Sequence, residues 1–233
     1  MTKLVLHDVS SHKPAEPIGD IIFVHGLKGH WDTTWTNGND RTWFNWLPRD
    51  RPDLNVWSFE YDAPISMFGG NTGALYDKAI QLLQCATVTG LGHRPICFIT
   101  HSLGGLIVKE LIQAVHTDTV SGYQIFRGKI CGVVFFSTPH RGAEIASLVK
   151  IVASQDVKDL IPGPQLQKLN AWYCKNAPTI HISTLSFFET MPTNGVQVVS
   201  RESGDPEIDG ATAIPFPANH FDICKPQFDS ELT

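Results

Sequence analysis

The sequence predicts an α/β protein with a mostly parallel central sheet and helices on both faces. Short β-rich runs alternate with longer segments of helical periodicity, which is the pattern of parallel strands joined by helices. The runs "DIIFV" and "ICGVVFF" are almost continuously apolar, as expected of strands that are covered on both faces. The 233 residues suffice for one sizeable core and not for two ordinary domains, so we expect a single domain over residues 1–233.

Seven segments are predicted to be strands because they are short, apolar or β-branched, and bounded by turn-forming residues. In chain order they are Lys3–Val9, Asp20–Val24, Asn55–Glu60, Ile96–Thr100, Lys129–Phe136, Thr179–Leu185 and Val196–Val199. Four helices are predicted from apolar residues at helical spacing. They lie in "ALYDKAIQLLQCAT", from Leu103 to Val115, within Ala143–Ser154 and near Gln165–Tyr173. In a doubly wound sheet of this kind, a functional site is expected beyond the C-terminal ends of the strands.

The composition excludes several classes of protein. With 42% hydrophobic and 18% charged residues, the chain is expected to fold, and its net charge of −5 gives no electrostatic basis for binding nucleic acid. The cysteines and histidines show no spacing typical of a metal site, so neither a metal nor another cofactor is expected. The N-terminal "MTKLVLHDVS" lacks the apolar core of a signal peptide, and no run approaches the roughly 18 apolar residues of a membrane span. A cytoplasmic protein is therefore predicted.

The stretch "CFITHSLGGLIVKEL" changes from strand to helix composition at Ser102. A serine hydroxyl is a poor nucleophile unless a base removes its proton and donors stabilise the oxyanion that develops. A sharp strand-to-helix turn lifts the hydroxyl clear of the backbone and aims helix N–H groups at the reacting carbonyl. Gly104 and Gly105 supply the small residues that such a turn needs, although Thr100 replaces the first glycine of the usual G-x-S-x-G pattern. We predict that Ser102 is a nucleophile; the alternative is a serine that only caps a buried helix.

A second signal is "IIFVHGLKG", in which an apolar strand ends in His-Gly. Hydrolases with a strand–serine–helix turn place a further oxyanion donor on such a loop. Gly26 would let the backbone approach the substrate closely, and the N–H of Leu27 would act together with that of Leu103. We expect His25 to be a structural hydrogen-bonding residue, because the base that accompanies such a serine comes late in the chain.

The late base is predicted to be His220, in "PANHFDICKP". It lies on a proline-flanked loop after the last predicted strand, in the chain order of nucleophile, acid and histidine. Three other histidines are weaker candidates. His181 lies within a strand pattern, His140 follows a strand directly, and His116 is expected on a helix surface.

Two carboxylates are candidates for the acid that would orient the histidine. Glu189 ends the apolar run of "ISTLSFFETMP", just before a turn that contains proline. Asp205 in "VVSRESGDPEI" is the alternative. Either residue could instead be a solvated charge of a loop, and the residues alone leave the choice open.

The segment "HWDTTWTNGNDRTWFNWLP" is rich in aromatic residues and follows the predicted oxyanion strand. It could form the wall of an acyl pocket or touch a membrane interface. The alternative is that its tryptophans pack the loop onto the core. These tryptophans are Trp31, Trp35, Trp43 and Trp46.

Six segments together resemble a known family. They are "FVHGLKG", "FEYDAP", "THSLGGLIVK", "FFSTPHRGA", "LSFFETMPT" and "NHFDICKP", and they extend from about Asp20 to Pro226. They are similar to the serine-active-site-containing lipase-like proteins of the α/β-hydrolase superfamily, a family that includes lipase-like effector domains of bacterial and fungal NOD-like immune receptors. The resemblance implies the α/β-hydrolase fold, with Ser102 as nucleophile and His220 as base. It favours Glu189 as the acid, although "ESGD" around Asp205 is also family-like.

The resemblance implies a serine hydrolase that cleaves lipid or phospholipid acyl esters through an acyl-enzyme. The alternatives are a non-catalytic effector module of an immune-receptor-type protein and a hydrolase of amide or thioester bonds. Peripheral contact with a membrane, self-association and attachment to a larger receptor chain are the hypotheses for partners. The C-terminal "ICKPQFDSELT" leads us to expect that the domain lacks the final helix that usually covers the sheet.

Overall fold

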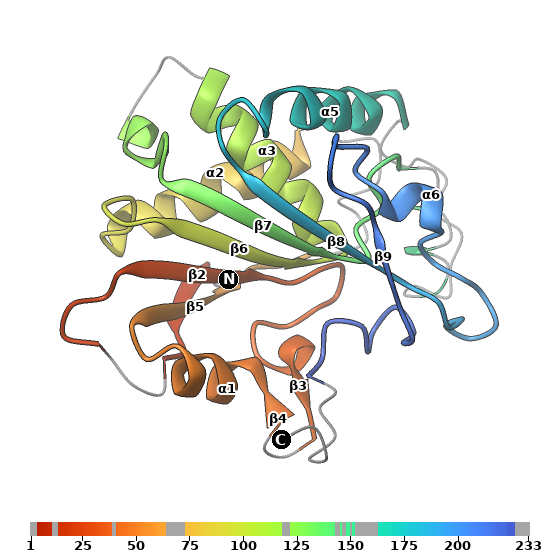
Figure 1. Ribbon diagram of the computed structural model, residues 1–233, viewed down its shortest axis with the longest axis horizontal. Helices are drawn as coiled ribbons and strands as arrows, with labels where there is room; N and C mark the ends of the chain where they lie inside the picture. Colours follow the sequence, from red (N-terminus) through yellow and green to blue (C-terminus); the bar gives the residue numbers. More distant parts are fainter. Residues whose placement is uncertain are drawn as a thin grey trace.

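A seven-stranded sheet forms the centre of the molecule (Figure 1). The computed structural model describes residues 4–10, 14–38, 41–63, 73–117, 122–142, 145, 148–149, 151 and 163–226. Within them, the strands follow the spatial order β1-β5-β2-β6-β7-β8-β9, and only the pairing of β1 with β5 is antiparallel. The predicted class, with a mostly parallel sheet, is confirmed. The strands are β1 (Val5–Asp8), β2 (Gly19–Val24), β5 (Leu54–Glu60), β6 (Ile96–His101), β7 (Ile130–Phe136), β8 (Ser183–Glu189) and β9 (Ile214–Phe216).

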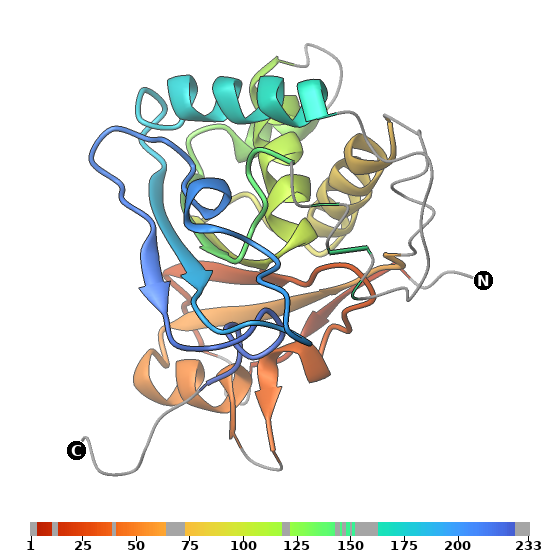
Figure 2. The ribbon, with the colours of Figure 1, turned by 90° about the vertical axis from the view of Figure 1, so that its right-hand side faces the viewer.

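Helices cover both faces of the sheet, as predicted. On one face lie α2 (Ala74–Val88), α3 (Leu103–Thr117) and α5 (Gly163–Asn176), whereas α1 (Trp43–Asp50) lies on the other (Figures 1 and 2). Within the described part of the chain, no helix is both long enough and apolar enough to cross a membrane. The remaining elements are short: η1 (Thr33–Trp35), β3 (Thr36–Asn37), β4 (Arg41–Thr42), η3 (Gly122–Phe126) and α6 (Arg201–Gly204).

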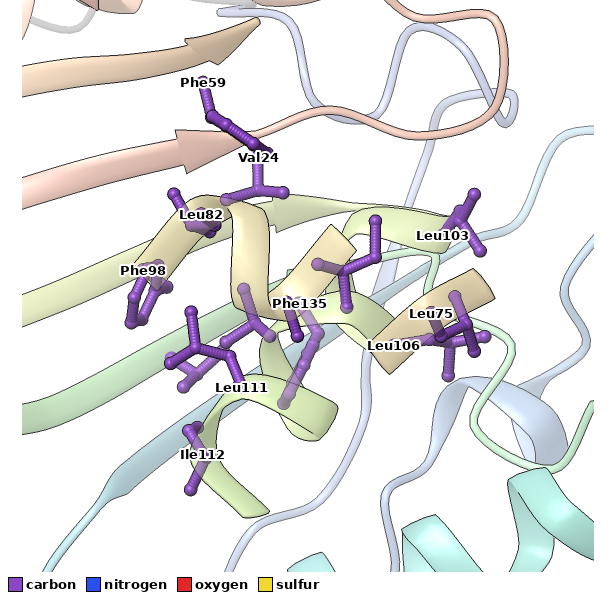
Figure 3. Packing of buried hydrophobic residues seen from close by; sticks show 14 of the residues in the cluster. Val24, Phe59, Leu75, Leu82, Phe98, Leu103, Leu106, Leu111, Ile112 and Phe135 are labelled. Atoms are coloured by element: carbon purple, nitrogen blue, oxygen red, sulfur yellow. The ribbon is translucent and has the colours of Figure 1, made fainter. Parts of the chain in front are cut away.

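The main core lies between the sheet and the layer of α2, α3 and α5. Figure 3 shows side chains of α3, among them Leu106 and Ile112, close to strand residues such as Phe98 and Phe135. Burial of one such apolar side chain stabilises the fold by about 1.5–3 kcal/mol. A smaller apolar cluster around Phe23 fills the opposite face. The strand β2 contributes to both clusters, which is why all of its residues are buried.

Three predicted helices correspond to α2, α3 and α5, and the one within Ala143–Ser154 falls largely outside the described residues. Two predicted strands need correction. Thr179–Leu185 begins too early, because residues 179–181 form the turn after α5 and β8 starts at Ser183. Val196–Val199 is not a strand: Val196 forms only an isolated bridge with Thr193. The sheet is extended instead by β9, which the sequence did not indicate because a proline is tolerated in a strand only at an edge.

Candidate active site

Ser102 lies at the turn between β6 and α3. Its backbone has φ of +53°, a left-handed conformation that costs a residue with a side chain of the order of 1–3 kcal/mol. Its N–H donates to the carbonyl of Phe136 at 2.8 Å, so the sheet ladder holds the turn in place. A serine that only caps a helix has extended backbone and turns its hydroxyl to a helix N–H. The backbone of Ser102 differs, and its hydroxyl pairs with His220.

The glycines of the turn allow three backbone segments to meet at Ser102. A Cβ added to Gly104 would lie 2.2 Å from the carbonyl oxygen of Val24, at the end of β2. A Cβ on Gly105 would lie 2.2 Å from Oγ1 of Thr138, and one on Gly26 would lie 2.8 Å from Cβ of Ser102. Real Cβ atoms do not approach neighbours so closely, so any larger residue would force these segments apart.

Thr100 does not crowd the turn, although it replaces a motif glycine. It belongs to β6 and is fully buried, and its hydroxyl donates to the carbonyl of Val134 in β7 at 2.9 Å. The β-branched side chain is therefore accommodated in the sheet, two residues before Ser102, where the turn begins.

Leu27 and Leu103 belong to the two segments that meet at Ser102. Leu27 directly follows Gly26, whose backbone packs against Ser102, and Leu103 is the first residue of α3. Both side chains are buried. The next backbone N–H along the loop, that of Lys28, donates to the carbonyl of Ala63 at 3.1 Å and fixes the course of this segment.

His220 lies on the loop after β9, and the structure brings it to Ser102. Its Nε2 atom is 3.1 Å from Oγ of Ser102, and both residues are buried. The backbone of His220 is held at two points. Its N–H donates to the hydroxyl of Thr193 at 3.0 Å, and its carbonyl accepts a hydrogen bond from Nε2 of His101 at 2.8 Å. The imidazole is therefore positioned by backbone contacts that do not involve its own ring nitrogens.

Glu189 is the last residue of β8, and its side chain lies behind His220. Its Oε1 atom is 3.4 Å from Nδ1 of His220, and both side chains are fully buried. Nδ1 has no closer hydrogen-bond partner among the described residues. Such contacts are often long in ligand-free sites and shorten when substrate binds. The carboxylate is fixed by the N–H of Val199, which donates to Oε1 at 2.6 Å, and by the hydroxyl of Ser137, which donates to Oε2.

Asp205, the other candidate acid, is engaged elsewhere. It follows α6, and its carboxylate accepts a hydrogen bond from the backbone N–H of Glu207 at 2.8 Å. No contact with His220 is present among the described residues. Of the two carboxylates, the structure brings Glu189 to the histidine.

Two comparisons of the sequence with known proteins gave different results. A search with protein-family models found no match. The sequence is 29% identical over 256 aligned positions to Protein SERAC1 of Homo sapiens, an alignment that covers 96% of this chain and 38% of that protein. The chain therefore spans less than two fifths of the length of the curated relatives it matches.

Solved structures share the arrangement of strands and helices. One is MGS-MChE2, an alpha/beta hydrolase enzyme from the metagenome of lagoon sediments, with a TM-score of 0.53, 11% identity, and coverage of 96% of this chain and 91% of that chain. The chain has the α/β-hydrolase fold. Phospholipase PlaB of Legionella pneumophila is similar over 81% of this chain and 44% of its own, with a TM-score of 0.58 and 14% identity.

Two residues of this site were missed in the sequence. His101, directly before Ser102, bonds the carbonyl of His220, and burial, reinforced by the neighbouring His220, lowers its pKa to about 3. It therefore remains neutral while it positions the loop. Ser137, which bonds Glu189, has φ of +47° and directly follows β7. The signals in the sequence that could have indicated these two residues are their positions: His101 is a polar residue directly before Ser102, and Ser137 is a polar residue directly after the run "VVFF".

His25 has the structural role expected of it. Its ring is stacked on Tyr61 with 4.3 Å between centroids, and its Nδ1 atom is 2.9 Å from the carbonyl oxygen of Gly26. Burial lowers the pKa of His25 to about 4, so the ring is neutral near pH 7. The hydroxyl of Tyr61 donates to the carbonyl of His25 at 2.5 Å and fixes the backbone just before the proposed donor Leu27.

The tryptophans of the loop after β2 pack mainly onto the protein. Trp35 is fully buried, with its ring edge-on to that of Phe23 at 4.8 Å between centroids. Trp43 donates from Nε1 to the carbonyl of Cys224 at 2.8 Å. Packing of the tryptophans onto the core was one of the alternatives that the sequence left open for this loop.

Trp31 and Trp46 also lie against aromatic neighbours. Trp31 stacks on His7 with 4.1 Å between ring centroids, and Trp46 contacts Trp43 edge-on at 6.3 Å. A cavity of about 360 Å³ is lined by His101, next to Ser102 in the chain, and by His30, Thr33 and Thr34 of the aromatic-rich segment. None of the four tryptophans is among the described residues that line it, and their role at an acyl pocket stays a prediction.

Among the weaker histidine candidates, His181 is exposed, His116 is near the end of α3, and His140 is fully buried away from Ser102. His140 belongs to a second polar cluster, centred on Lys109 of α3. The ammonium group of Lys109 is 2.6 Å from Nδ1 of His140 and 2.5 Å from Oδ1 of Asn170. It also lies 4.9 Å from the ring centroid of Tyr173. This cluster ties α3 to α5 and to the loop after β7.

The Lys109 cluster makes the stability of the fold depend on pH. Burial lowers the pKa of Lys109 from 10.5 to about 7. Between these pH values the unfolded chain holds a proton that the folded chain has released, so the free energy of unfolding should rise with pH. One such group gives a slope of at most about 1.4 kcal/mol per pH unit.

Lys109→Met removes this titration while it retains most of the side-chain volume. We expect the difference in the free energy of unfolding between wild type and the variant to increase from pH 7 to pH 10, because only wild type carries the titrating amine. Urea unfolding of both proteins across this range measures the difference between their free energies of unfolding. The opposing contribution of the buried cysteines is the same in both proteins and cancels in this difference. Equal pH slopes for the two proteins would show that Lys109 does not titrate in this window.

Proposed function

We propose that this chain is a serine hydrolase that cleaves carboxylic esters, with lipid or phospholipid acyl esters as its substrates. The observation that carries the proposal is the 3.1 Å contact between Oγ of Ser102 and Nε2 of His220 at a strained strand-to-helix turn. Glu189 behind the imidazole supplies the third member of a Ser-His-acid triad. The retention of all three groups favours an enzyme over a non-catalytic module.

In the acylation step, Nε2 of His220 takes the proton of Ser102, and the serine oxygen attacks the ester carbonyl carbon. The negative charge that forms on the carbonyl oxygen is stabilised by the N–H groups of Leu27 and Leu103. When the tetrahedral intermediate collapses, the bond to the alcohol oxygen breaks. His220 then gives its proton to the departing alcohol, which leaves an acyl group on Ser102.

In the deacylation step, His220 removes a proton from water, and the hydroxide attacks the acyl carbonyl. Collapse of the second tetrahedral intermediate releases the carboxylic acid and returns the proton to Ser102. In both steps Glu189 stabilises the imidazolium, and it keeps the proton of the neutral ring on Nδ1, so that Nε2 faces Ser102 as an acceptor. The bonds from Val199 and Ser137 keep the carboxylate in this position.

The choice of lipid esters is supported by three observations. Leu27, Ile151 and Phe221 give apolar walls to a cavity that is also lined by His101, the residue before Ser102, and Phe221 is partly exposed. Phospholipase PlaB shares the fold. The sequence segments around the site also resemble lipase-like proteins.

A hydrolysis screen tests the proposed function. Wild type and Ser102→Ala are compared on para-nitrophenyl esters, phospholipids, thioesters and peptides. We expect wild type to release acid from esters, including phospholipids, and Ser102→Ala to be inactive. Hydrolysis of thioesters or peptides in preference to every ester would assign the same residues to a different bond. Equal hydrolysis by both proteins would contradict the proposal.

A further inference from the structure

Two of the segments that carry the family resemblance, "THSLGGLIVK" and "FFSTPHRGA", meet at a buried pair of side chains. The pair is Lys109, the last residue of the first segment, and His140 of the second. Both residues are fully buried. The proposed reaction gives a role to Ser102 in the first segment and leaves this pair unused.

The hydrogen bonds around His140 have one consistent set of directions. The hydroxyl of Ser186 donates to the carbonyl of Gly204 at 2.7 Å, so its oxygen is free to accept from Nε2 of His140 at 3.4 Å. A neutral imidazole that donates from Nε2 accepts at Nδ1. Lys109 supplies that donor at 2.6 Å and makes a second bond, to Oδ1 of Asn170, at 2.5 Å. An amine has the two N–H bonds that this arrangement needs whether it is charged or neutral.

This polar pair is an expensive way to fill the space between α3 and the loop after β7. Burial, reinforced by Lys109, lowers the pKa of His140 well below 6.5, so the imidazole is uncharged. Both described polar partners of Lys109, the imidazole and the amide of Asn170, are therefore neutral. A buried amine without a charged partner costs free energy that an apolar side chain of similar volume would not. Groups that break this rule are expected where function requires them.

Ser137 connects the loop after β7 to the acid. Its hydroxyl donates to Oε2 of Glu189, and its N–H donates to the carbonyl of Phe187 at 2.8 Å. Its φ of +47° is a left-handed conformation, which a residue with a side chain adopts only where its surroundings impose it. Residues 137–140 are all buried, so the placement of Ser137 depends on how this short segment is held at its other end.

His140 is the held end of the segment. Its N–H donates to the carbonyl of Ser203 in α6 at 2.9 Å, and its ring is bonded by Lys109. Lys109 belongs to α3, which starts directly after Ser102, about two helical turns earlier. The helix that begins at the nucleophile therefore also holds the segment that contacts the acid.

We propose that Lys109 and His140 are positioning residues for the ester hydrolysis. By fixing residues 137–140 to α3, they keep the hydroxyl of Ser137 on the carboxylate of Glu189. The inference rests on the proposed function and adds to it two residues that touch neither the substrate nor the reacting atoms. Their effect should fall on kcat, and KM should change little.

The combined variant Lys109→Met/His140→Phe tests the proposal. Replacement of a buried polar pair by apolar groups of similar volume is often nearly neutral for stability, so we expect the variant to fold. Its kcat for a para-nitrophenyl ester should fall by about tenfold or more, because a displacement of about 1 Å at a catalytic group can cost about a hundredfold. His140→Asn should keep most of kcat, since its amide oxygen can accept from Lys109 in place of Nδ1.

Tyr173→Phe is the matched control within the same cluster. It removes the hydrogen bond between the tyrosine hydroxyl and Thr184, 2.9 Å apart, and keeps the ring beside Lys109. We expect a lower thermal midpoint and an unchanged kcat. A loss of kcat in Tyr173→Phe as large as that in the combined variant would overturn the proposal, because any loosening of the cluster would then have the same effect.

A comparison in the Glu189→Gln background shows whether the pair acts through the acid. Once the carboxylate is gone, Lys109→Met/His140→Phe should lower kcat little further. An equal fold-decrease in both backgrounds, or an unchanged kcat in the folded combined variant, would overturn the proposal. Lys109→Met alone is the milder variant, and the same two comparisons apply to it if the combined variant does not fold.

A crystal structure of the combined variant separates this proposal from the proposed reaction, because it does not depend on turnover. We expect the contact between Ser137 and Glu189 to be lost in this variant and kept in Tyr173→Phe. Loss of the contact in a protein that hydrolyses no ester would support the positioning role while the proposed function fails. An unchanged contact, together with ester hydrolysis by wild type, would reject the positioning role and leave the proposed function standing.

Discussion

Replacement of Ser102 by alanine is expected to lower kcat/KM for ester hydrolysis by about a thousandfold or more. The variant keeps the turn and its glycines but has no oxygen to attack the carbonyl. His220→Ala should lose a similar factor, because the serine then has no base at the 3.1 Å contact. The two groups act as a unit, so the double variant should be scarcely worse than either single variant.

The measurement is kcat/KM with a para-nitrophenyl ester, accompanied by the thermal midpoint of each variant. Ser183→Ala, at the exposed start of β8, is the matched control and should retain full activity. A Ser102→Ala protein that is folded and still turns over ester at the wild-type rate would remove Ser102 from the mechanism. Additive losses in the double variant would show that the two residues act separately.

Glu189→Gln is expected to lower kcat/KM by about 10²–10⁴-fold with little change in the fold. The amide oxygen can still accept a hydrogen bond from the N–H of Val199, and the amide NH₂ can donate to the hydroxyl of Ser137, so the side chain should keep its place. The amide carries no charge to stabilise the imidazolium of His220. The loss should therefore appear in kcat as well as in kcat/KM.

Asp205→Asn serves as the comparison for Glu189→Gln. The carboxylate of Asp205 bonds the N–H of Glu207, a contact that an amide oxygen can replace, so only a small change in activity is expected. Both variants are measured over pH 5–9 under the same conditions. If Asp205→Asn were the more damaging substitution, the role of the acid would pass from Glu189 to Asp205.

The sequence indicated the parts of the site that depend on local pattern. The turn at Ser102 was predictable because the strand, the serine and Gly104 are contiguous, and Gly104 meets β2 at a distance that only glycine allows. The position of His220 followed from chain order. The choice between Glu189 and Asp205 was not accessible from the residues alone, because it depends on where β8 ends relative to the loop after β9.

Contacts made across the fold were beyond prediction. The bond from His101 to the carbonyl of His220 joins the end of β6 to the loop after β9, which no local pattern connects. The helix α1 contains Pro48 and lies in the segment predicted to be a loop, although a cap from Thr42 and burial of Phe44 stabilise it. The edge strand β9 was hidden by Pro215, for the same reason that proline is allowed there.

The central claim, that Ser102 is an activated nucleophile, is tested most directly by a fluorophosphonate probe. Such a probe forms a covalent bond with a serine oxygen only where a base and an oxyanion site activate it. Mass spectrometry of digested wild-type protein should find one probe group per chain, on Ser102. His220→Ala should react far more slowly. A folded wild-type protein that stays unlabelled, or that is labelled at another serine, would contradict the account.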